Sequence, residues 1–222
     1  MITRIGLAPR RPGLDVDTFQ AHWRGRHGEL AAQLPGVRRY WQNHAVLRDG
    51  EPLLPWTGFD ACAEIDFESL EAMAGAFVTP LYLGPIRDDE AYLIEKTRGG
   101  MVLTRRTILS GAPHLEGIRL LTFLRAAPGK PARDLQAALA EAPDVPEAVG
   151  RELCAALDPE EAGGHVSVFD AVEVLWFATA QDAERHVVSA GARARRAGFA
   201  ERVRGVERLI ARVRVMVDAA AG

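Results

Sequence analysis

The sequence predicts an α+β fold made of two βαββαβ units, each with one four-stranded antiparallel sheet. Three observations favour this fold. Residues 59–67 (FDACAEIDF) align without a gap on residues 169–177 (FDAVEVLWF), 110 positions later. A helix-like segment follows each copy, and segments with alternating apolar residues lie near both ends of each half. We therefore divide the chain into a first unit at residues 1–112 and a degenerate second unit at residues 113–222.

Hydrophobic periodicity and turn residues predict the elements of the first unit. Alternation predicts strands over residues 2–8, 37–47, 59–67 and 101–109, and helical spacing predicts helices over residues 15–33 and 68–77. Asp15 or Asp17 can cap the first helix, and Pro35-Gly36 ends it.

The second unit repeats this order less regularly. We expect strands over residues 117–124 and 210–217, a third strand that begins at His165, and helices over residues 131–141 and 180–190. Residues 144–158 are expected to add another helical piece, and residues 110–117 to form a linker. Because this unit has no Trp-x3-His helix and no Tyr-x-Gln strand, we expect one site per chain, in the first unit.

The sheets predict how the two units pack. In a βαββαβ unit both helices cover one face of the sheet, so the other face is left bare. An apolar face must be covered. The sheet of the other unit can cover it, which gives a barrel closed within one chain, and a second subunit can serve the same purpose. The sequence leaves both arrangements open.

The first helix carries a histidine on its apolar face. Phe19, Trp23, His27, Leu30 and Leu34 follow each other at three- and four-residue spacing. His22 lies five residues from His27, so in a regular α-helix the two do not share a face. A buried imidazole is either a hydrogen-bonded core residue or a group that transfers protons near neutral pH.

The strands that follow this helix supply partners for His27. Alternation places Tyr40, Gln42 and His44 on one face of their strand. In the next strand we expect the apolar set to face the helices, and the other set to face a cavity between the sheets. The apolar set is Phe59, Ala61, Ala63, Ile65 and Phe67, and the cavity set is Asp60, Cys62, Glu64 and Asp66. Such a cleft suits enolisation, dehydration or cyclisation of a carbonyl compound, with Tyr40 and Gln42 polarising the carbonyl while His27 moves a proton.

The spacing Phe-x3-Trp-x3-His-x7-Pro-Gly-x3-Tyr-x-Gln, from Phe19 to Gln42, resembles the EthD family. The resemblance implies two ferredoxin-like repeats packed as in the dimeric α/β-barrel proteins. It implies lyase, cyclase or isomerase chemistry without a cofactor on a small apolar carbonyl or polyketide-like compound. Two alternatives stay open: a cofactor-less monooxygenase acting on a phenolic or anthrone-like substrate, and a ligand-binding accessory protein of a degradation pathway that has no catalytic activity.

The candidate site residues follow from the motif and from the strand faces. We expect His27, Tyr40 and Gln42 to be catalytic, and we expect the substrate to be bound by Trp23, Trp41, His44, Cys62 and Glu64. The histidines show no metal-ligand spacing, so no metal is expected. No cofactor is expected either. Some relatives with two such repeats bind haem through a histidine of the second repeat, and His186 or His165 would be the candidate for that role here.

Charge and composition exclude several classes of binding partner. The net charge is −3, so the chain as a whole does not attract nucleic acid or anionic lipid. Its basic charge is almost all arginine, since Lys96 and Lys130 are the only lysines. Cys62 and Cys154 lie far apart, and no apolar run has the length of a membrane span. No nucleotide-binding or serine-hydrolase motif is present. We expect a cytoplasmic homodimer that acts on a small molecule.

Overall fold

The computed structural model describes residues 1–54 and 59–218. The elements of the first repeat are β1 (Ile2–Ala8), α1 (Val16–His22), the π-helix η1 (Trp23–His27), α2 (Gly28–Ala31), β2 (Val37–Ala45), β3 (Leu47–Arg48), β4 (Glu51–Pro52), β5 (Ala61–Phe67), α3 (Leu70–Ala76), the π-helix η2 (Tyr82–Ile86), α4 (Arg87–Leu93) and β6 (Gly100–Gly111). Those of the second repeat are β7 (Ile118–Ala126), α5 (Ala132–Glu141), β8 (Gly150–Ala156), β9 (Ala171–Phe177), α6 (Ala180–Val188), α7 (Ala190–Phe199) and β10 (Val203–Asp218).

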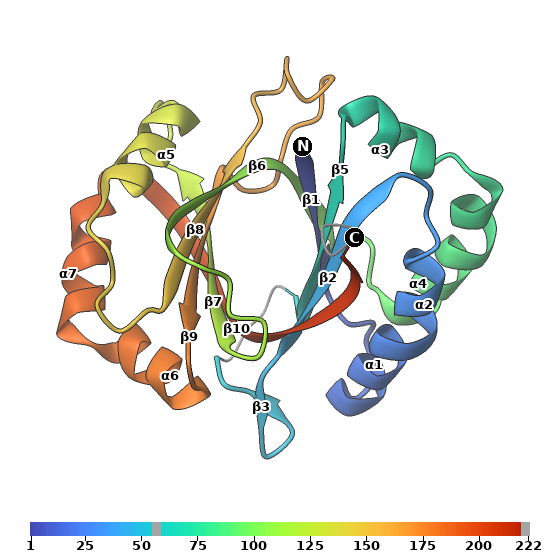
Figure 1. Ribbon diagram of the computed structural model, residues 1–222, viewed down its shortest axis with the longest axis horizontal. Helices are drawn as coiled ribbons and strands as arrows, with labels where there is room; N and C mark the ends of the chain where they lie inside the picture. The colour runs from blue at the N-terminus through green and yellow to red at the C-terminus, as the bar shows by residue number, and fades with distance from the viewer. Residues whose placement is uncertain (55–58, 219–222) are drawn as a thin grey trace.

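Eight strands form a closed antiparallel barrel in the order β1-β5-β2-β10-β7-β9-β8-β6. The helices of the first repeat cover one side of the barrel and those of the second repeat cover the opposite side (Figure 1). The predicted α+β fold with two ferredoxin-like repeats is confirmed. Strand β2 pairs with β10 and β6 pairs with β8, so the barrel closes within one chain. The homodimer stays a prediction, and closure of the barrel does not require it.

The barrel interior is filled by apolar and charged side chains. Residues of both repeats pack there, among them Ile5, Trp41, Cys62, Phe123, Cys154 and Trp176. The guanidinium of Arg119 donates hydrogen bonds to Glu64 and Asn43, and both Arg119 and Glu64 are fully buried. Burial opposes ionisation of Glu64, but Arg119 and Arg39 outweigh it and lower the pKa of Glu64 to about 2. A paired ionic cluster therefore occupies the space between the sheets, where the sequence predicted a cavity.

The register predicted for β5 is confirmed within the strand, but not for the two residues before it. Asp60 was expected to face the space between the sheets, but its carboxylate accepts hydrogen bonds from Arg10. Cys62 packs in the interior cluster, whereas Ala63 and Ile65 pack under the helices. Phe59 was expected on the helix side, but it packs in the interior. The reason is that β5 begins only at Ala61, so strand alternation does not extend to Phe59.

Two expectations for the second repeat are wrong. Residues 144–158 were expected to be helical, but they contain the strand β8. Its residues, GRELCAA, include good helix formers, and the ladders that β8 makes with β6 and β9 override that local preference. The third strand was expected to begin at His165, but β9 begins at Ala171.

Candidate functional site

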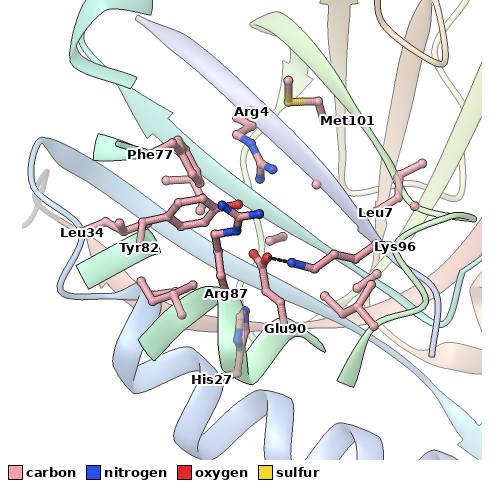
Figure 2. Close-up of a pocket in the computed structure, with 18 of the residues that line it drawn as sticks. Arg4, Leu7, His27, Leu34, Phe77, Tyr82, Arg87, Glu90, Lys96 and Met101 are labelled. Carbon is pink, nitrogen blue, oxygen red and sulfur yellow. Dashed lines mark ion pairs between the residues drawn. The ribbon is translucent and has the colours of Figure 1, made fainter. Parts of the chain in front are cut away.

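A cavity of about 620 Å³ lies between the outer face of the first-repeat sheet and its helices. Its wall is formed by β1, β2, β5 and the start of β6, by the helical segment around η1, and by η2 and α4. His165 and Val168 of the second repeat also line it. Figure 2 shows Arg4 entering from β1 and His27 from the opposite helical side. The site is thus on the helix side of the sheet, not between the sheets as the sequence predicted.

His27 is held by a carboxylate that comes from another helix. Its Nδ1 lies 3.0 Å from Oδ2 of Asp89, which belongs to α4, and His27 is only 6% exposed. The same carboxylate accepts a hydrogen bond from Nε2 of His22 at 2.8 Å and one from Nε of Arg26 at 3.1 Å. Asp89 therefore fixes the orientation of the imidazole that lines the cavity.

His22 and His27 reach the same carboxylate because the helix between them is not α-helical. Residues Trp23–His27 form a π-helical turn, in which the N–H of Gly28 bonds to the carbonyl of Trp23. This wider turn brings residues five apart to the same side of the helix. The sequence prediction that His22 and His27 do not share a face is wrong for this reason. π-turns are frequent at functional sites.

The Asp89 contact determines which ring nitrogen of His27 carries the proton. A carboxylate accepts hydrogen bonds, so Nδ1 donates its proton to Asp89, and Nε2 of the neutral ring is left with a lone pair. Burial opposes ionisation of Asp89, but its hydrogen bonds from His27 and His22 outweigh burial and lower its pKa to about 2. Asp89 is therefore charged at neutral pH and stabilises His27 when the ring takes up a proton.

A relay of hydrogen bonds orients Tyr40 at the cavity wall. His44 donates from Nε2 to Oε1 of Gln42 at 3.0 Å, and the amide of Gln42 donates to the Tyr40 hydroxyl oxygen at 2.9 Å. The Gln42 amide also donates to the carbonyl of Trp23 at 2.7 Å. Since the Tyr40 oxygen already accepts a hydrogen bond, its own proton is free to be donated to a molecule in the cavity.

Burial keeps both ends of this relay neutral. It lowers the pKa of His44 to about 3, helped by the charges of Arg24 and Arg214, so the ring is a donor without charge. Burial also raises the pKa of Tyr40, so its hydroxyl stays protonated at neutral pH.

Three cationic side chains and one carboxylate line the same cavity: Arg4, Arg87, Lys96 and Glu90. Glu90 pairs with Lys96 at 2.9 Å. The guanidinium of Arg4 lies 4.6 Å from the centre of the Phe77 ring, and burial lowers its pKa (Figure 2). A Cβ on Gly6 would come within 2.6 Å of Arg4 Nη1, so glycine at this position leaves room for the folded-back arginine. The cavity carries an excess of positive charge.

The structure brings some of the expected site residues together and separates others. His27, Trp23 and Tyr40 line the cavity, while Gln42 and His44 are buried behind Tyr40. Trp41, Cys62 and Glu64 were expected to bind substrate, but alternation turns them into the filled barrel interior, away from the cavity.

The residues of η2 and α4 that complete the site were not predicted from the sequence. Asp89 and Glu90 stand in an acidic run, Asp88-Asp89-Glu90, that follows Pro85. Acidic residues in a first turn are a helix-start signal, so this run could have indicated α4, which was not among the helices predicted. No local pattern indicated that Asp89 contacts a histidine 62 positions earlier.

The described residues form neither a metal-binding cluster nor a membrane-spanning helix. Within residues 1–54 and 59–218, no group of three or more histidine, cysteine, aspartate or glutamate residues is arranged to hold a metal ion. None of the described helices combines the length and the hydropathy needed to cross a bilayer.

Comparison with known proteins gives a family match and a set of similar folds. Residues 11–97 match the model of the EthD domain. No protein of curated function matches the sequence. An "anthrone oxidase-like protein" has a TM-score of 0.65 at 13% identity, covering 98% of this chain and 94% of its own. A "putative monooxygenase" from Lactobacillus acidophilus has a TM-score of 0.52 at 9% identity, covering 98% and 96%. At these identities the likeness shows the fold alone.

Proposed function

We propose, starting from the EthD domain at residues 11–97, that the protein is an enzyme that removes a proton from a small carbonyl compound. The observation that carries the proposal is the Asp89–His27 pair at the wall of a cavity of about 620 Å³. His27 Nε2 acts as the general base, and Asp89 stabilises the imidazolium that forms. Proton transfer of this kind requires no cofactor.

The charges around His27 support a substrate that becomes an anion. Proton removal next to a carbonyl group places negative charge on the carbonyl oxygen. Arg4 and the Tyr40 hydroxyl are the donors that would hold this oxygen, and their fixed positions favour the anion over the neutral ketone. The apolar part of the cavity wall, which includes Trp23 and Phe77, fits a flat hydrocarbon body.

The enolate formed in this way leads to isomerisation, elimination or cyclisation, according to the substrate. A second function shares the same first step. If the anion is that of a phenol or an anthrone, dioxygen can oxidise it, so that a CH2 group and O2 give a C=O group and water. The likeness in fold to an anthrone oxidase-like protein favours this alternative. A third alternative is a protein that binds a ligand in the same cavity without converting it, and this alternative predicts that no product forms.

Two model compounds separate these functions. In heavy water, proton removal from β-tetralone replaces the hydrogens on the carbon between the ring and the ketone by deuterium. The proton NMR signal of these hydrogens then disappears. Anthrone in air reports oxygenation through oxygen uptake and the absorbance of anthraquinone. Exchange without oxygen uptake supports the acid/base enzyme, and anthraquinone formed with oxygen uptake supports the oxygenase. Binding of both compounds with neither exchange nor oxidation would overturn both enzyme proposals and leave a ligand-binding protein.

A further inference from the structure

The second repeat has a cavity of its own, on the opposite side of the barrel from the first. It has a volume of about 280 Å³ and lies between β7, β9 and β10 and the helices α5, α6 and α7 (Figure 1). Its wall is mainly aliphatic and includes Leu120, Leu124, Leu139, Leu175, Phe199 and Val203. This cavity plays no part in the function proposed above.

One carboxylate faces this cavity, and it is already neutralised. Glu173 accepts hydrogen bonds from Arg195 at 2.6 Å and from Arg151 at 3.0 Å. Both partners are arginines, so Glu173 cannot serve as the counter-ion of a further cation without leaving one of them.

Two other arginines, Arg208 and Arg196, also line the wall. Among the described residues, neither Arg208 on β10 nor Arg196 on α7 has a carboxylate within 4.0 Å. Burial lowers the pKa of Arg208, and the neighbouring charge of Arg196 lowers it further. A cation beside an apolar cavity is unfavourable unless an anion joins it. Arg196 is exposed at the rim, where its Nη1 donates a hydrogen bond to the carbonyl oxygen of Val187 at 3.3 Å, and Arg208 is half-buried. The described wall therefore carries two positive charges without a carboxylate partner, which favours a negatively charged ligand.

We propose that this second cavity binds a small amphipathic carboxylate. The carboxylate would accept hydrogen bonds from the guanidinium groups of Arg208 and Arg196, a geometry that arginine supports through its paired donors. The apolar tail would lie among the leucine side chains. The site is independent of the His27 cavity, so its occupancy does not depend on the proposed enzyme activity.

Calorimetric titration of the full chain tests the proposal, with octanoate and phenylbutyrate as probes and octanol as the uncharged control. We expect saturable binding of at least one carboxylate and much weaker binding of octanol. Arg208→Leu should weaken carboxylate binding by roughly ten- to a hundredfold, since a hydrogen bond to a charged group is lost. Arg196→Leu, at an exposed helix position, should weaken it in the same direction.

Matched variants show which of the two cavities binds the carboxylate. Arg212→Leu removes an arginine that is exposed on the same strand but outside the cavity, and it should bind as the wild type does. Arg4→Leu alters the first cavity and should leave this affinity unchanged. The proposal is overturned if the wild type binds neither carboxylate, if octanol binds as tightly as octanoate, if folded Arg208→Leu and Arg196→Leu proteins keep the wild-type affinity, or if Arg4→Leu abolishes the binding.

Discussion

Replacement of Asp89 by asparagine is the most informative single change in this protein. The side chain is almost fully buried and receives hydrogen bonds from His27, His22 and Arg26. Asparagine keeps the size of the side chain but removes its charge. The change therefore separates the electrostatic role of Asp89 from its packing.

The size of the effect follows from the pKa of Asp89. Its value is about 2 in the folded protein, against an ordinary value of 3.8. At about 1.4 kcal/mol per pH unit, this difference corresponds to roughly 2 kcal/mol of folding free energy. Since the folded pKa is the lower one, this stabilisation is complete above about pH 4 and is lost as the pH falls towards about 2.

Urea unfolding followed by tryptophan fluorescence, from about pH 6 down to about pH 2, measures this dependence. Over the acid part of this range, the wild type should lose roughly 2 kcal/mol more than Asp89→Asn does. Asp88→Asn is the matched control, because Asp88 is the neighbouring aspartate and is exposed; it should follow the wild type. Parallel curves for the wild type and Asp89→Asn would refute the reasoning that the histidines hold Asp89 in its charged form.

Three further predictions concern other parts of the molecule. Tyr40→Phe should lower turnover of a confirmed substrate by ~10²–10³ without unfolding the protein, since one donor to the oxyanion is lost; a wild-type rate would exclude Tyr40 from this role. Arg119→Leu should destabilise the fold by up to roughly 3–5 kcal/mol in urea unfolding, because the buried Glu64 loses its closest cationic partner and keeps only Arg39, at 3.4 Å; a change below about 1 kcal/mol would contradict this account of the interior. Cys62 and Cys154 should resist a thiol reagent in the folded protein and react in urea, because burial raises the pKa of both thiols; fast labelling of the native protein would show that the interior is open.

The parts of the fold that local patterns determine were predictable from the sequence. Asp15 caps the first helix, as expected, because its side chain accepts the N–H of Thr18. Ala63 and Ile65 lie under the helices because strand alternation determines their face once the strand is recognised. His27 lies on the apolar face that its spacing indicated, and it is buried.

The parts that depend on distant contacts were not predictable. The π-turn that aligns His22 with His27 has no signature in residue spacing, and Asp89 reaches both rings only through the packing of α4 against η1. The cavity was expected on the wrong side of the sheet, because the sequence does not reveal that Arg119 and Glu64 fill the barrel interior. Strand β8 was missed for a similar reason, since its neighbours in the barrel determine its conformation.

The central claim is that His27, and not merely a histidine bound to Asp89, removes the proton. The chain offers a matched pair, because His22 contacts the same carboxylate but does not line the cavity. The decisive measurement is the rate of deuterium exchange into β-tetralone for the wild type, His27→Gln and His22→Gln. We predict that His27→Gln slows exchange by ~10²–10⁴ while His22→Gln keeps it within about tenfold of the wild type. Equal rates for all three folded proteins, or a larger loss in His22→Gln than in His27→Gln, would contradict the assignment of His27 as the base.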